Sequence, residues 1–136
     1  MIMIRLLVAV VLSATIGFER QIRSQLAGLR THMLVCLGAT LITITSVYGF
    51  NADPARVAAG IVTGIGFLGA GTIIASQGKI KGLTTAASLW IASGIGIAVG
   101  VGFYTAAIIS TLLVVGILEL WRVEVKTGIK KFDRER

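Results

Sequence analysis

The stretch from Val57 to Leu118 contains only two charged residues, Lys79 and Lys81, and both lie in one short gap. Further long apolar runs lie upstream, and hydrophobic residues make up 55% of the chain. A soluble domain of 136 residues cannot bury so much apolar surface, because each helix of a small globule must keep a polar face toward water. The sequence therefore predicts a membrane protein with several spans, for which the lipid bilayer is the solvent.

The charge composition is consistent with this interpretation. Charged residues make up 14% of the chain, against roughly 25% in a typical soluble domain. The net charge of +7 comes from basic residues in the gaps between apolar runs and in the tail, so membrane topology explains it without nucleic-acid binding. The N-terminus lacks a basic region and a cleavage site, which predicts a retained first span. Cys36, the one cysteine, is interpreted as a structural thiol.

Span lengths follow from the bilayer, whose hydrocarbon core of about 30 Å needs about 20 helical residues. The uncharged run from Gly82 to Leu118 has 37 residues and as one helix would be about 55 Å long. We therefore expect two spans there, joined by a turn at Gly100 and Gly102, where glycine permits the backbone to reverse. The fold class predicted is an all-α bundle of five transmembrane helices in residues 1–121, with spans at 2–18, 33–50, 57–75, 82–99 and 103–121 and a basic tail at 122–136.

The distribution of basic residues predicts the orientation. Five spans place on one side three segments with eleven basic residues, and leave two, Arg5 and Arg56, on the other side. Because Lys and Arg concentrate in cytoplasmic loops, the N-terminus is expected outside and the C-terminus in the cytoplasm. Arg5 lies near the end of its span, where its side chain can reach the interface. The eleven residues are Arg20, Arg23, Arg30, Lys79, Lys81, Arg122, Lys126, Lys130, Lys131, Arg134 and Arg136.

The glycines of the third and fourth spans predict close helix contacts. The run from Gly64 to Gly69 matches the GxGxxG pattern of dinucleotide sites, but it lacks the preceding strand and the later acidic residue that such a site needs. Small residues at four-residue spacing let helix backbones approach in lipid. A broken third span that lines a cavity is the alternative. The predicted packing residues are Gly60, Gly64, Gly66, Gly69, Gly71, Gly96 and Gly100.

Two carboxylates, Glu19 and Asp53, are the candidate metal ligands. Glu19 ends the first span, either as an interfacial group or as a buried carboxylate paired with an arginine such as Arg30. Asp53 precedes Pro54 and Arg56, and it either caps the third span or binds a cation outside the membrane.

The remaining polar candidates lie at span ends. His32 is interpreted as an interfacial anchor, because no metal-ligating residue lies at ligand spacing from it. Thr84 and Thr85 are expected to cap the fourth span and bond to its backbone, and the ring N–H of Trp90 needs a partner. No nucleophile, metal triad or phosphate loop is recognisable, so we expect no enzyme. The full set of polar candidates is Glu19, Arg20, Arg30, Thr31, His32, Asp53, Arg56, Thr84, Thr85 and Trp90.

Four segments in order carry a family resemblance. They are Gly17-Phe18-Glu19-Arg20, Ala27-Gly28-Leu29-Arg30-Thr31-His32, residues 64–71 (GIGFLGAG) and residues 82–90 (GLTTAASLW). Over nearly the whole chain, the sequence resembles the transmembrane domain of the MgtC/SapB family. It differs in having Gln25-Leu26 where a basic-proline pair is usual, and the cytoplasmic regulatory domain of many members is expected to be absent.

The resemblance implies a bacterial or archaeal inner-membrane protein linked to growth at low magnesium and, in some pathogenic members, to survival inside host cells. It implies no catalytic activity. One hypothesis is a non-enzymatic protein that contacts other membrane proteins, with the ATP synthase as a partner proposed for the family. The alternative is a transporter or channel for Mg²⁺ or another cation. Because Glu19, Asp53 and Glu119 lie at different depths, that function would need a homo-oligomer that gathers carboxylates into a ring.

Overall fold

The computed structural model describes residues 1–50, 53–76 and 79–120 of the chain. Within these residues the secondary structure is five helices and one short hairpin. Four of the helices have 18 to 21 residues and are long and apolar enough to cross a membrane, whereas α5 has 16 residues and is shorter. The elements are α1 (Ile2–Ile22), α2 (Leu29–Gly49), α3 (Pro54–Gly71), β1 (Ile74–Ser76), β2 (Lys79–Lys81), α4 (Leu83–Val101) and α5 (Tyr104–Glu119).

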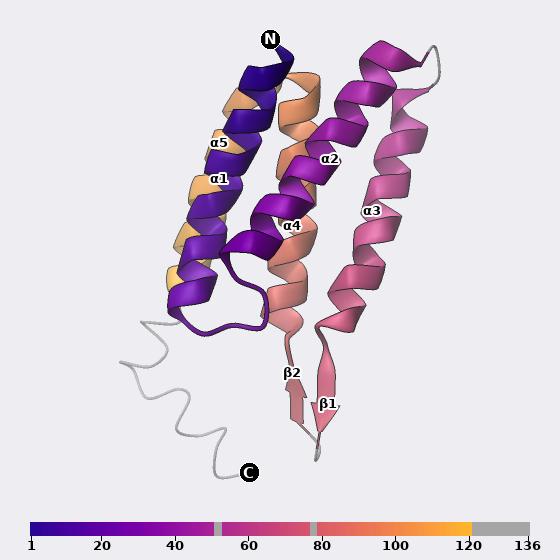
Figure 1. Cartoon of the computed structure of the whole chain (residues 1–136). Helices are drawn as coiled ribbons and strands as arrows, with labels where there is room; N and C mark the ends of the chain where they lie inside the picture. Colours follow the sequence, from indigo (N-terminus) through magenta and orange to yellow (C-terminus); the bar gives the residue numbers. More distant parts are fainter. Residues whose placement is uncertain (51–52, 77–78, 121–136) are drawn as a thin grey trace.

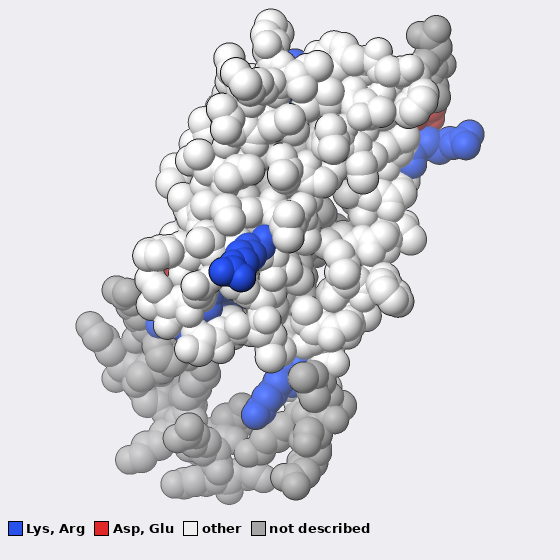
Figure 2. All heavy atoms as spheres, in the orientation of Figure 1, with Lys and Arg blue, Asp and Glu red and all other residues white. Residues whose placement is uncertain are grey.

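Consecutive helices run in opposite directions, so the connections collect at two ends of the bundle (Figure 1). At one end, here called the hairpin end, lie the end of α1, the start of α2, the hairpin and the end of α5. At the other end, here called the N-terminal end, lie the start of α1 and the turn between α4 and α5. On the face seen in Figure 2, the described surface between the ends is mostly uncharged, and one Lys or Arg side chain projects near the middle of the view. A surface with so few charges suits a hydrocarbon environment.

Helices α1, α2 and α4 enclose most of the core, and α5 packs against α1 and α4. The buried cluster includes Ala9, Ile16, Cys36, Ile95 and Val99. Helix α3 stands at the edge of the bundle (Figure 1), against α4 and part of α2. Of the 18 residues of α3, all described, only Ile65 and Gly69 are buried. Most of the α3 surface is therefore available to lipid or to another protein.

The third span differs from its prediction. The helix was expected to continue to residue 75, but α3 ends at Gly71 and Ile74–Ser76 pairs antiparallel with Lys79–Lys81. Thr72 closes the helix, since its backbone N–H and its hydroxyl both donate to the Gly69 carbonyl, at 3.0 and 2.7 Å. Hydropathy alone did not reveal this hairpin because its first strand is as apolar as the helix before it. Between Pro54 and Gly71 the helix is uninterrupted, which excludes the broken-helix alternative for these residues.

The end of α1 and the start of α2 differ from the predicted span boundaries for the same reason. Helix α1 continues to Ile22 and α2 begins at Leu29, so both helices include polar residues that the hydropathy pattern left in the loop. Three of those polar side chains, Glu19, Arg20 and His32, are buried and bind partners inside the bundle, so the helices can extend past the apolar runs. The turn predicted between the fourth and fifth spans is confirmed, with Gly102 in the left-handed region at φ +93°. The last residue of the predicted fifth span, residue 121, and the basic tail lie outside the described residues.

Candidate functional site

A buried ion-pair cluster occupies the hairpin end of the bundle. The Glu19 carboxylate accepts hydrogen bonds from Arg20 Nε and Arg23 Nε, both at 2.6 Å, and from Arg20 Nη2 at 3.2 Å. Glu19 and Arg20 are 7% and 4% exposed. A buried carboxylate held by two guanidinium groups is stable because the hydrogen bonds offset its desolvation.

Arg23 extends this cluster to the far end of the chain. Its Nη2 atom lies 3.2 Å from Glu119 Oε2, which joins the end of α1 to the end of α5. We call Glu19, Arg20, Arg23 and Glu119 the charge cluster. The spacing of Glu19 and Arg23, four residues apart on one helix, could have predicted their pairing, whereas no sequence signal pointed to the pairing of Arg23 with Glu119. The expectation that Glu19 and Glu119 lie at different depths was wrong, because both bind Arg23.

The buried-carboxylate interpretation of Glu19 is therefore the one that the geometry supports. The expected arginine partner was wrong, because the described ion pairs of Glu19 are with Arg20 and Arg23, while Arg30 is exposed. Thr31, next along the chain, is exposed as well.

His32 is buried between helices, so its interpretation as an interfacial anchor was wrong. Its Nδ1 atom lies 2.9 Å from the Gly28 carbonyl and its Nε2 atom 3.0 Å from Ser88 Oγ. Because a carbonyl only accepts, Nδ1 carries the hydrogen. The Ser88 hydroxyl has one hydrogen and two acceptors within reach, His32 Nε2 and the Thr85 carbonyl, which lies at 2.8 Å. His32 thus joins α2 to α4. Gly17 makes room for it, since a Cβ there would lie 3.1 Å from the His32 Cβ.

The start of α4 differs from the expected capped helix. The N-cap is Gly82, and no side chain caps the helix. Thr84 is exposed, whereas Thr85 is buried and its hydroxyl has no partner among the described residues. Trp90 is 52% exposed on the outside of α4.

A cavity of about 920 Å³ lies beside the charge cluster, where the ends of α1 and α5 meet the start of α4. Its walls combine the charge cluster with apolar side chains of α1 and α5. The lining residues are Thr15, Phe18, Glu19, Arg20, Ile22, Arg23, Gln25, Thr84, Val115, Ile117, Leu118, Glu119 and Leu120.

The predicted packing glycines fall into two groups. Gly96 and Gly100 lie against α2: a Cβ at Gly96 would meet the Cys36 carbonyl, and one at Gly100 would lie 2.6 Å from the Thr43 Cβ. Gly69 makes an ordinary contact with Ala86 of α4. A Cβ at any of the other four predicted glycines would meet nothing within 4 Å among the described residues. These four are Gly60, Gly64, Gly66 and Gly71.

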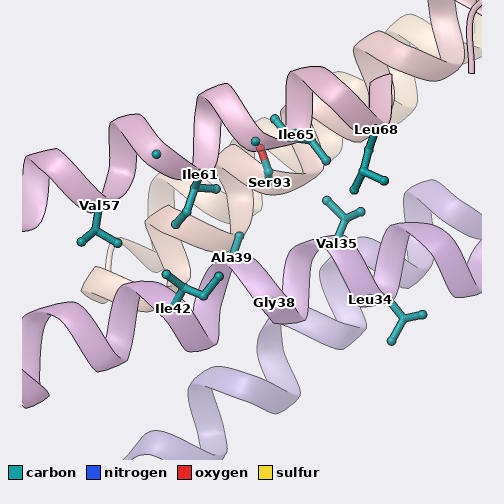
Figure 3. Close-up of a pocket in the computed structure, with 12 residues that line it drawn as sticks. Leu34, Val35, Gly38, Ala39, Ile42, Val57, Ile61, Ile65, Leu68 and Ser93 are labelled. Carbon is teal, nitrogen blue, oxygen red and sulfur yellow. The ribbon is translucent and has the colours of Figure 1, made fainter. Parts of the chain in front are cut away.

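Two of these open glycines, Gly60 and Gly64, line an apolar groove of about 570 Å³ between α2 and α3. Figure 3 shows Val57, Ile61, Ile65 and Leu68 of α3 on one side and Leu34, Val35, Gly38, Ala39 and Ile42 of α2 on the other. Ser93 of α4 also lines the groove, and its hydroxyl donates to the Trp90 carbonyl.

Asp53 lies at the opposite end of the bundle from Glu19. Its Oδ1 atom accepts from the Ala55 backbone N–H at 2.9 Å, which confirms the predicted cap of α3. Arg56 is exposed nearby. The two candidate metal ligands are therefore far apart within one chain. Among the described residues, no three His, Cys, Asp or Glu side chains come together as a metal site would require.

The Arg5 side chain was expected to extend to the membrane interface, but it points into the bundle instead. It is buried, its Nη1 atom donates to the Gly100 carbonyl at 2.6 Å, and its guanidinium lies 5.2 Å from the centre of the Tyr48 ring. A cation is favourable there, because the carbonyl end of a helix carries partial negative charge. Arg5 therefore ties the start of α1 to the end of α4.

Four apolar helices of spanning length, a mostly uncharged surface between the two ends and polar side chains buried between helices define a multi-pass helical membrane protein that lies in a lipid bilayer. The sequence comparison makes the assignment more specific. The chain belongs to the MgtC family, whose family model matches residues 6–126.

Curated relatives share more than two fifths of the aligned residues. The chain is 42% identical over 127 residues to a protein of Escherichia coli K12 named "Putative magnesium transporter YhiD", covering 87% of this chain and 59% of that protein. It is 44% identical to the protein MgtC of Brucella abortus and 45% identical to that of Salmonella typhimurium LT2, covering 84% and 82% of this chain and 48% of each relative. The chain thus spans about half of the length of these relatives. No solved structure matches it.

Proposed function

We propose that this protein acts in magnesium homeostasis or low-magnesium adaptation in the inner membrane, through contacts with other membrane proteins and without catalysis. Membership of the MgtC family and the magnesium-related name of one relative support the link to magnesium. The proposed contacts are with further copies of this chain or with a membrane complex such as the ATP synthase.

The observation that carries this proposal is the open groove between α2 and α3. Gly38, Gly60 and Gly64 line it, and a Cβ at each would meet nothing within 4 Å among the described residues. Glycine inside a helix costs about 1 kcal/mol relative to alanine, and packing among the described residues does not offset that cost at these positions. In lipid, exposed glycines favour association because a second helix can approach the backbone closely.

Affinity purification from native membranes tests the proposal. We expect the wild-type chain to retain a stoichiometric partner and the double variant Gly60→Leu/Gly64→Leu to lose it, because the leucines would fill the groove. Gly66→Leu is the matched control, since Gly66 lies on the same helix and is equally open but does not line the groove. If the wild type captures no partner, or if the double variant captures as much as the control, the contact proposal is wrong.

A second candidate is an oligomeric transporter of Mg²⁺ or another cation. It is favoured by the exposed Asp53 carboxylate, copies of which a symmetric oligomer could gather at one end of the pore. Asp53→Asn and Asp53→Ser both retain a residue that caps a helix but remove the charge. Liposomes with wild-type protein should then take up Mg²⁺, and both variants should abolish uptake. Absence of wild-type flux under a wide range of gradients would exclude this candidate.

A further inference from the structure

The hydrogen bonds around His32 form a chain that begins and ends at a backbone carbonyl. Nδ1 of the ring lies 2.9 Å from the Gly28 carbonyl, and Nε2 lies 3.0 Å from Ser88 Oγ. The same hydroxyl lies 2.8 Å from the Thr85 carbonyl. Both side chains are buried, His32 at 0% and Ser88 at 3% exposure. Their polar atoms therefore depend on these contacts.

The three contacts of this chain need three hydrogens, because each hydrogen bond requires one donor. The two carbonyls have no hydrogen to donate. A neutral imidazole provides one hydrogen and the Ser88 hydroxyl provides another, so one contact stays without a hydrogen. The imidazolium form carries a hydrogen on both ring nitrogens and provides the third. The chain of hydrogen bonds is therefore complete only when His32 is protonated.

Ser88 can pair with either form of the ring, because its hydroxyl hydrogen can rotate. Opposite a neutral ring, the hydroxyl can donate to Nε2. Opposite a charged ring, Nε2 donates to Ser88 Oγ, and the hydroxyl donates to the Thr85 carbonyl. A buried charge is costly unless it is hydrogen-bonded, and in this arrangement both N–H groups of the charged ring have an acceptor. No heavy atom has to move between the two forms.

The charged groups that act on the ring come from α1. Glu19 attracts a proton on His32 and Arg20 repels it. On α2 itself, Arg30 is exposed, and Cys36 is buried one turn further along the helix. Helix α4, described over its whole length, has only uncharged side chains. Its contribution to a charged ring is therefore made through the hydroxyl that faces Nε2.

We propose that His32 is a proton-binding site of the bundle and that Ser88 adapts this site to both protonation states. The proton comes from the solution at the hairpin end, where α2 begins (Figure 1), and binds at Nε2. The hydrogen bond that joins α2 to α4 then becomes charge-assisted, which makes it roughly twice as strong. The site is separate from the groove between α2 and α3 and does not depend on the proposed function.

Nuclear magnetic resonance of the full chain in lipid bilayers tests the proposal. His32 is the one histidine of the chain, so isotope-labelled histidine reports this ring alone when the protein is purified without a histidine tag. At mildly alkaline pH we expect hydrogen on Nδ1 and none on Nε2. Because the charge of histidine ordinarily changes between about pH 5 and 8, both nitrogens should gain hydrogen in one reversible step as the pH falls through this range.

Ser88→Ala and Ser93→Ala form a matched pair of variants. Both serines are buried in α4 and donate to the carbonyl three residues before them, but Ser93 bonds to Trp90 and not to the ring. Ser88→Ala should lower the proton affinity of His32 about tenfold, which is about one pH unit in the titration midpoint, because the charged ring loses more than the neutral ring does. Ser93→Ala should leave the midpoint unchanged.

Three results would overturn the proposal. The first is a ring that keeps one protonation state at every pH at which circular dichroism shows the folded bundle. The second is a neutral ring with its hydrogen on Nε2, because the contact with the Gly28 carbonyl would then have no donor. The third is a titration midpoint of folded Ser88→Ala equal to that of Ser93→Ala.

Discussion

Arg5, Glu19 and His32 are buried polar side chains; Arg5 and His32 are stabilised by groups of another helix, and Glu19 by arginines at the end of its own helix. Arg5 binds the carbonyl end of α4, Glu19 holds two arginines, and His32 joins α2 to Ser88 of α4. An unsatisfied polar group in lipid would cost several kcal/mol, so these contacts must form together with the helix packing.

At the residue scale, Gly96 and Gly94 give a matched pair of substitutions on α4. A Cβ at Gly96 would lie 2.9 Å from the Ala39 Cβ and would meet the Cys36 carbonyl, while one at Gly94 meets nothing within 4 Å among the described residues. We expect Gly96→Ala to destabilise the protein by about 1–3 kcal/mol through overpacking. Gly94→Ala should be neutral or stabilising, by up to about 1 kcal/mol. Thermal unfolding in detergent measures both, and equal midpoints would contradict the close approach of α2 and α4.

At the element scale, the bundle has a tight part and a loose part. Helices α1, α2 and α4 share the polar contacts and the close glycine approaches, whereas α3 buries only Ile65 and Gly69 among its residues, all of which are described. A short hairpin joins α3 to α4, and a two-stranded hairpin has little stability of its own. Its geometry therefore depends on the residues where it meets the helices.

Gly82 is the residue at which the hairpin meets α4. Its substitution gives a second test of the structure, after that of Gly96. Its φ of +91° lies in the left-handed region, and a Cβ there would collide with the Thr72 carbonyl. We expect Gly82→Ala to destabilise the protein by about 1–3 kcal/mol. Gly71→Ala, at the end of α3 and open in the described structure, is the control and should change the midpoint little. A thermal unfolding midpoint for Gly82→Ala equal to that of the control would rule out this turn.

At the scale of the whole molecule, the alternating helix directions gather the basic residues of the described loops at the hairpin end (Figure 1). Arg23 and Lys81 lie there, while Arg56 lies at the start of α3. We propose from this arrangement that the hairpin end faces the cytoplasm.

Single cysteines test this orientation. In a Cys36→Ala background, which removes the one native thiol, a membrane-impermeant thiol reagent should label Arg56→Cys in intact cells. Lys81→Cys should react only after the membrane is permeabilised. Both positions are exposed, so the membrane alone should decide their reactivity. Labelling of Lys81→Cys in intact cells would reverse the proposed orientation.

Several local features could be read from the sequence, because each depends on neighbouring residues alone. The turn at Gly102 and the Asp53 cap are of this kind, and both are confirmed. The predicted partner of Glu19, Arg30, was wrong because the sequence offers many arginines and does not say which of them the rotation of the helix brings near the carboxylate. Glu119 was missed because its pairing with Arg23 joins residues 96 positions apart.

The sequence by itself determined that this chain is a multi-span helical membrane protein, because its apolar runs have the lengths that the thickness of the bilayer requires. Its ordered motifs determined the MgtC family. The tertiary structure decided which polar residues lie inside and which glycines contact a helix. Gly96 and Gly60 have the same local sequence character, yet one touches α2 and the other borders an open groove. That difference depends on how each helix is rotated and which neighbour it meets, and both are set by packing of the whole bundle.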